Sequence, residues 1–213
     1  MPVFIINMQI NTNYNHTTFT SRAQIIKEAD KICRNVNKTF PHFSPSYSWI
    51  NFNMPEKYDP NFSKIEQKLE NIRNQTDKAP TPFKYYNTLM KLVKKYKCAN
   101  CGELADITYI SCKNKNLKDV NIVGIYGYNP KKKKYVEYDH IAVSFKSGKK
   151  QIVIDPWFGI ADFANNCLVE YKQKYHKFFK NFNPNLKMIL KKEDRINIDP
   201  YDMEKIMNKY PEL

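Results

Sequence analysis

The sequence predicts an α+β fold, with helices first, an antiparallel meander next and helical segments at the end. Apolar residues recur at helical spacing in residues 21–37, 61–74 and 83–96, the pattern of amphipathic helices. They alternate at strand spacing in residues 120–128 and 135–145, the pattern of half-buried strands. Hydrophobic residues make up 42% of the chain and aromatic residues 14%, which is enough apolar side chain to fill a core.

The N-terminal region, residues 1–80, is predicted to be a helical extension packed on a core formed by residues 81–213. The length of 213 residues suits a single compact domain that contains both parts. Within the extension, residues 1–15 are predicted as a short strand and a polar loop. Residues 40–60 hold four prolines and are predicted as loop. Residues 75–82 are polar and form the predicted linker.

Two helix starts follow the linker. Thr81 can cap a helix that has Pro82 at its first position. Further on, Asn100 and Glu103 have the spacing of a capping box, in which each side chain accepts from the backbone amide of the other residue. The helix after this box, residues 104–112, is apolar on nearly all sides and is therefore predicted to be buried.

The core continues with three predicted strands. Residues 120–128 and 135–145 are joined by a turn at Asn129-Pro130 with its lysine run, and residues 151–155 end at a proline. Ser147-Gly148 is the predicted turn between the second and third strands. The remainder is predicted as helix around residues 169–179, loop around residues 181–185 and a last helix near residues 200–209.

The charge of the chain is strongly positive, because 35 basic residues face 21 acidic ones and give +14. Of the basic residues 31 are lysine and 4 are arginine, whereas readers of base sequence depend on the bidentate contacts of arginine. The charge therefore allows weak affinity for phosphates or acidic surfaces and predicts no specific nucleic-acid partner. The five glycines are too few for a phosphate-binding loop, which excludes a Walker or dinucleotide motif.

The cysteines indicate a reducing compartment, since their number is odd and their spacing is sparse. No apolar run approaches the roughly 20 residues of a membrane span, and the start of the chain lacks the basic leader of a secretory signal. We therefore expect a cytoplasmic protein, or one that a specialised secretion system exports into a host cytosol. The five cysteines are Cys33, Cys98, Cys101, Cys112 and Cys167.

Among the five cysteines, Cys101 has the position that most favours a reactive thiolate. As the first residue of a capped helix, it faces unpaired backbone amides and the positive end of the helix dipole, which favour the thiolate. The same amides can form an oxyanion hole. Cys112, at the far end of that helix, has neither advantage and is expected to be an inert core thiol.

The predicted hairpin adds a histidine and a carboxylate. A two-residue turn at Ser147-Gly148 makes paired residue numbers sum to 295 and sets His140 directly opposite Asp155. Asp139 then points to the other face of the sheet. Cys101, His140 and Asp155 form a predicted catalytic triad, in which the thiol attacks a carbonyl, the imidazole moves the proton and the carboxylate orients the imidazole.

The three segments Asn-Cys-Gly-Glu-Leu-Ala, Asp-His-Ile-Ala-Val and Ile-Val-Ile-Asp-Pro-Trp-Phe-Gly carry this trio. In their order and spacing they resemble the transglutaminase-like branch of the papain-like cysteine enzymes, over about residues 83–163. The resemblance implies a catalytic core that acts on protein amides as a peptidase, glutamine deamidase or transglutaminase, without metal or cofactor. It implies a protein substrate, and the positive charge favours an acidic one. Through the triad alone, the chain also resembles bacterial effector cysteine enzymes delivered into host cells.

The resemblance has two departures. Papain-like peptidases carry an oxyanion glutamine about six residues before the cysteine, where this chain has Lys95. We expect Tyr96 or Asn100 to replace that glutamine as the oxyanion donor. Arylamine N-acetyltransferases, whose triad spacing is similar, carry an arginine and paired glycines before the cysteine, which this chain lacks. Acetyl transfer is therefore the weaker alternative.

Two further interpretations remain. Cys98 and Cys101 form a C-x-x-C pair, which suits zinc or redox chemistry, but no second pair of ligands follows it. Alternatively, the chain is a non-catalytic basic binding module on a degenerate papain-like fold, with its lysines contacting an acidic partner, a membrane surface or RNA.

Overall fold

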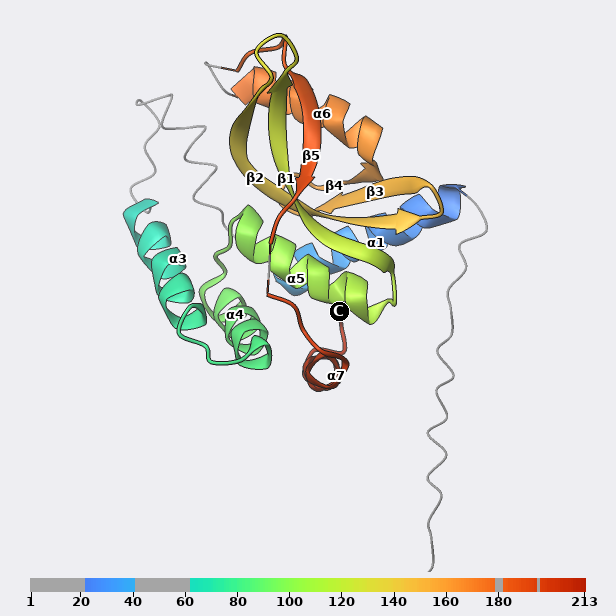
Figure 1. Cartoon of the computed structure of the whole chain (residues 1–213). Coiled ribbons are helices and arrows are strands. Elements are labelled where there is room, and N and C mark those ends of the chain that lie inside the picture. The colour runs from blue at the N-terminus through green and yellow to red at the C-terminus, as the bar shows by residue number, and fades with distance from the viewer. Residues whose placement is uncertain (1–21, 41–61, 179–181, 195) are drawn as a thin grey trace, which may run out of the picture.

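The computed structural model describes residues 22–40, 62–178, 182–194 and 196–213. In these residues six helices surround a five-stranded antiparallel sheet of order β4-β3-β2-β1-β5 (Figure 1). The predicted α+β class is confirmed. The helices are α1 (Arg22–Thr39), α3 (Phe62–Thr76), α4 (Pro82–Tyr96), α5 (Cys101–Asn114), α6 (Ala164–Phe178) and α7 (Pro200–Lys209). The strands are β1 (Lys118–Asn129), β2 (Lys134–Ser147), β3 (Lys150–Asp155), β4 (Ile160–Phe163) and β5 (Lys187–Lys192).

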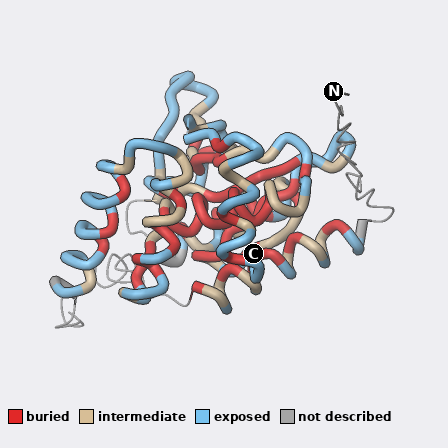
Figure 2. The backbone as a smooth tube through the Cα atoms, turned by 90° about the horizontal axis from the view of Figure 1, so that it is seen from below, coloured by how far each residue is buried: buried red, intermediate tan, exposed pale blue. Residues whose placement is uncertain are grey.

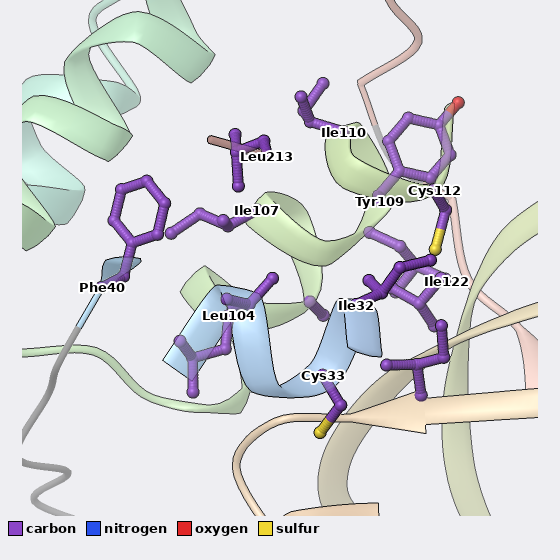
Figure 3. Packing of buried hydrophobic residues seen from close by; sticks show 14 of the residues in the cluster. Ile32, Cys33, Phe40, Leu104, Ile107, Tyr109, Ile110, Cys112, Ile122 and Leu213 are labelled. Carbon is purple, nitrogen blue, oxygen red and sulfur yellow. The ribbon is translucent and has the colours of Figure 1, made fainter. Parts of the chain in front are cut away.

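The sheet is covered on both faces. Helices α1 and α5 pack on one face and α6 packs on the other (Figure 1). On the first face, Ile32 of α1, Leu104 of α5 and Ile122 of β1 belong to one apolar cluster (Figure 3). On the second face, Val153 of β3 packs with Tyr171 of α6. Because both faces are buried, residues 152–154 of β3 are all apolar.

Helix α5 is the centre of the first layer. It is buried from Glu103 to Cys112, as predicted from its apolar character. Helix α4 packs between α5 and α3, and α7 packs against α4. Figure 2 shows the resulting pattern, in which the sides of the helices that face inward are buried and the outer turns are exposed.

The N-terminal extension supplies helices to two places. Helix α1 packs against β3, β4 and α5 and contributes Ala29 and Ile32 to the main cluster. Helix α3 packs against α4, on the outside of the helical layer. The strand and loop predicted for residues 1–15 lie outside the described residues, and so does the loop predicted for residues 40–60, except Phe40.

Two strands and one helix boundary differ from the prediction. Strands β4 and β5 were not predicted, because β4 has only four residues and the sequence of β5, Lys187–Lys192, does not alternate between apolar and polar residues. They form because β3 and β1 offer unpaired edges to them. Helix α6 begins at Ala164, earlier than the predicted residue 169.

Local capping signals place the helix starts correctly. The Thr81 side chain accepts a hydrogen bond from the Lys84 amide at 3.2 Å, and Pro82 occupies the first turn of α4. The N-cap oxygen satisfies an amide that has no intrahelical partner.

We expect Thr81→Ala to lower the free energy of unfolding by about 1 kcal/mol, because this acceptor is lost. Thr81→Ser retains the hydroxyl and serves as the matched control. Chemical denaturation of both variants provides the measurement. Equal stability of the alanine and serine variants would contradict a capping role.

Candidate active site

Cys101 is the most accessible thiol among the described residues. It is the first residue of α5 and is half-buried, whereas the other four cysteines are buried. Its Sγ lies 4.0 Å from the carbonyl oxygen of Asp139 on β2. Burial raises the pKa of Cys98 to about 11 and the pKa of Cys33 and Cys167 to about 12. Those thiols are therefore poor nucleophiles at neutral pH.

The predicted capping box is present at the start of α5. The Asn100 amide donates to Glu103 Oε2 at 2.9 Å, and the Asn100 side chain caps the Glu103 amide in return. Gly102 leaves space beside the thiol, since a Cβ added there would meet only Ile141, at 4.0 Å. The box thus fixes Cys101 at an open helix N-terminus.

His140 and Asp155 meet in a buried pair. The Nε2 atom of His140 lies 2.7 Å from Oδ2 of Asp155, and the two side chains are 5% and 1% exposed. Asp155 also accepts from the Tyr171 hydroxyl at 2.8 Å and from the Phe158 amide at 3.1 Å. Because a buried carboxylate needs such donors, these contacts hold Asp155 in a single orientation toward the imidazole.

The hairpin that brings this pair together has a different register from the prediction. Its turn residues are Gly148 and Lys149 instead of Ser147 and Gly148, and paired numbers sum to 297. Gly148 has φ 60°, which suits the first central position of a two-residue turn. The predicted direct opposition of His140 and Asp155 is therefore wrong. A shift of two residues preserves the alternation of faces, so the two side chains meet diagonally.

A β-bulge in β2 includes His140. Between two regular pairs of the β1–β2 ladder, residues 138–140 lie opposite Ile125 alone. Asp139, in the middle of the bulge, has φ 47°, a left-handed conformation that aspartate tolerates better than most residues. Bulges often redirect a side chain beside an active site. Here the bulge lies beside His140 and places the Asp139 carbonyl oxygen 4.0 Å from Cys101 Sγ.

The ionisation of His140 is set by its neighbours. Burial lowers the pKa of His140, but the charge of Asp155 and the hydrogen bond to it have the larger combined effect, and Cys101 adds to it. The resulting pKa lies well above the ordinary histidine value. Since Nε2 faces Asp155, Nδ1 is the atom left for the thiol. The arrangement favours the charged imidazolium form of His140.

Three aromatic rings enclose the imidazole. The centroids of Trp157, Phe158 and Tyr171 lie 5.1, 4.8 and 5.8 Å from that of His140. Trp157 and Phe158 follow Asp155 in the turn to β4, and Tyr171 comes from α6. Their bulk excludes water from the pair, which strengthens its electrostatic interaction.

The two predicted oxyanion donors occupy different surroundings. Tyr96, the last residue of α4, accepts a hydrogen bond at its hydroxyl from Asn71 Nδ2 at 3.0 Å. Asn100 is engaged in the capping box. The oxyanion assignment of these side chains stays a prediction. The first-turn amides of α5 are alternative donors, because helix geometry leaves them without an intrahelical acceptor.

The sequence analysis did not identify two of the residues at the site. Tyr171 is 16 positions from Asp155, and Arg73 is 30 positions from its partner Glu103. Tyr171 is one of 15 tyrosines, so only the packing of α6 on the sheet distinguishes it. Arg73 is one of only four arginines in a lysine-rich chain, which is the one feature that could have drawn attention to it.

Metal ligation and membrane crossing have no support in the described part of the chain. It contains no group of three or more His, Cys, Asp or Glu side chains placed to hold a metal ion. Cys98 and Cys101 are both free thiols, and Cys98 Sγ bonds the Ile65 carbonyl. None of the described helices has the length and apolar character that a bilayer crossing requires.

No protein-family model, curated protein or solved structure matches this chain. The functional argument therefore depends on the geometry of the site.

We expect Tyr171→Phe to lower the free energy of unfolding by about 1.5–3 kcal/mol, because a hydrogen bond to a buried carboxylate is lost. Tyr138→Phe is the matched control. It belongs to the same aromatic layer, and its hydroxyl has no hydrogen-bond partner among the described residues. Denaturation should separate the two variants, and equal effects would argue against the Tyr171–Asp155 contact.

The raised pKa of His140 predicts a pH-dependent stability. Protonation of His140 contributes stability that is fully present below the ordinary histidine pKa and declines as the pH rises toward the pKa of the folded state. The difference in unfolding free energy between wild type and His140→Gln should therefore fall from pH 6 to pH 10. Denaturation of both proteins at several pH values measures this difference. Groups that titrate in the same way in both proteins do not contribute to it. A difference that grows with pH would contradict the shift.

Proposed function

We propose that this protein is a thiol-dependent acyl-transfer enzyme that acts on protein amide bonds, with Cys101, His140 and Asp155 as its catalytic residues. The observation that carries the proposal is the combination of a half-buried thiol at the first position of α5 with a buried His140–Asp155 pair. The interaction with Cys101 contributes to the raised pKa of His140. A nucleophile, a base and an orienting carboxylate in this order are the requirements of such catalysis.

The fold proposed for this chemistry is the papain-like one, in its transglutaminase-like branch. In its favour are a nucleophile at the start of a buried helix and a histidine and aspartate on neighbouring antiparallel strands. Residues 1–80 would then be an extension that packs on the catalytic core formed by residues 81–213.

The proposed reaction starts with the proton of Cys101 on His140. The thiolate attacks the carbonyl carbon of an amide, and first-turn amides of α5 stabilise the oxyanion. The carbon–nitrogen bond breaks while His140 gives its proton to the leaving amine, which leaves a thioester on Cys101. Water or a second amine then attacks the thioester, loses a proton to His140 and releases the thiolate. Peptide hydrolysis, glutamine deamidation and transamidation differ only in the leaving and attacking groups.

The charge of +14 supports an acidic protein as substrate, because a positive surface accelerates the encounter with an acidic partner. A bacterial effector that modifies a host protein fits this proposal. The buried cysteines are compatible with a reducing cytosol, since the structure records them as free thiols.

We expect iodoacetamide at pH 6 to label Cys101 much faster than the other four cysteines and faster than a model thiol. Intact-mass analysis of candidate protein substrates should then show a gain of about one dalton, a cleavage or a cross-link, each a different fate of one acyl-enzyme. Cys101→Ala should abolish this change, and Cys112→Ala is the control because Cys112 is a buried thiol of the same helix.

An unreactive Cys101 would contradict the proposal. Steeply salt-dependent binding of an acidic partner that persists in Cys101→Ala, without any mass change, would instead favour a non-catalytic binding module.

A further inference from the structure

Arg73 of α3 forms an ion pair beside the candidate nucleophile. Its Nε donates to Glu103 Oε1 at 2.9 Å. The second oxygen of Glu103 accepts from the Asn100 amide. The Glu103 side chain is 8% exposed, whereas Arg73 is 52% exposed. Glu103 and Cys101 lie in the same turn of α5. The Arg73 guanidinium therefore covers the solvent side of a buried carboxylate close to the thiol.

This carboxylate creates an electrostatic problem for the thiol. Glu103 carries a negative charge two positions after Cys101, and Asp139 carries another on the bulge that contacts Sγ. Negative charges at this range disfavour a thiolate. The capping box requires an acceptor at Glu103 but does not require a net charge, because glutamine caps equally well. A cation beside Glu103 removes the conflict.

The Arg73 guanidinium and the Cys101 thiol interact electrostatically. Burial lowers the pKa of Arg73, but the charge and hydrogen bond of Glu103 raise it, and Cys101 and Asp139 raise it further. The influence is mutual, because an anionic Cys101 that favours the charged arginine is favoured by it to the same extent.

Charged and titratable groups surround Cys101 on several elements. On α5 there is Glu103 itself; the others are Arg73 on α3, Cys98 before α5, Asp139 and His140 on β2, Asp155 on β3, and Tyr175 on α6. The cations in this region are Arg73, the imidazolium of His140 and Lys68 of α3, which acts on Cys98. The Asp155 charge is engaged by His140, and Arg73 is the cation that hydrogen-bonds Glu103.

We propose that Arg73 is a positioning residue which offsets the charge of Glu103, so that this carboxylate does not oppose the nucleophilic form of Cys101. This inference rests on the proposed function, since it concerns the same nucleophile. It also gives the N-terminal extension a role, because α3 supplies a charge that the core lacks at this position. A purely structural ion pair would hold α3 against α5 without affecting the reactivity of the thiol.

The test is the pH profile of Cys101 alkylation in the full chain. Arg73→Gln should move the midpoint upward by about one pH unit, and thus slow alkylation about tenfold below it. Arg73→Lys retains the charge and should remain close to wild type. Arg34→Gln is the matched control, because Arg34 pairs with the exposed Asp30 on α1.

Glu103→Gln supplies the reciprocal variant. Because it removes the negative charge and retains a capping acceptor, it should move the midpoint downward, and combined with Arg73→Gln it should restore a profile near wild type. These variants keep the inference testable if Arg73→Gln alone does not fold.

An unchanged midpoint in folded Arg73→Gln, or no recovery in the double variant, would overturn the role of Arg73. A wild-type Cys101 that alkylates no faster than a model thiol would instead count against the proposed enzyme. The two failures are therefore distinguishable.

Discussion

The arrangement of the site depends on the buried carboxylate of Asp155. Taking a carboxylate out of water costs several kcal/mol unless donors replace the lost hydration. Here the donors come from β2, from α6 and from the turn after β3. Helix α1 supports the same turn, since Asn37 Nδ2 donates to the Pro156 carbonyl at 3.0 Å. Satisfying one acidic side chain thus ties β3 to β2 and α6, α1 adds a separate bond to the same turn, and the orientation of His140 is a consequence.

The nucleophile depends on a second polar constraint, at the start of α5. A helix N-terminus leaves several amides unpaired, and the capping box satisfies part of them with Glu103. The acidic member of the box strengthens the cap and at the same time adds a negative charge near a residue that must become negative. In the proposed enzyme, the Arg73–Glu103 pair would resolve this conflict between helix stability and thiol reactivity. Stability and chemistry would then be coupled through α3, although α3 packs outside the central layers.

The sequence alone predicted the features that follow local rules. Asn100 and Glu103 stand three positions apart, and their capping box needs no information from elsewhere in the chain. The hairpin register was wrong because it depends on which residue takes the positive φ, and Gly148 takes it at the first position of the turn. The pairing of His140 with Asp155 was predicted nevertheless, because a shift of two preserves the alternation of faces. Tyr171 and Arg73 act through contacts between distant elements, which periodicity and spacing do not encode.

The bulge at Asp139 explains how residues from two layers reach one another. Cys101 packs with the cluster between α5 and the sheet, whereas the face that carries Asp155 packs against α6. The imidazole of His140 shares the α6 face with Asp155, since Tyr171 of α6 contacts both side chains. Extra residues in β2, with a left-handed φ at Asp139, turn the strand at this point. The imidazole can then contact Asp155 through one nitrogen and the thiol through the other. The bulge at Asp139 is thus the point at which β2 approaches the start of α5, since the Asp139 carbonyl oxygen lies 4.0 Å from Cys101 Sγ.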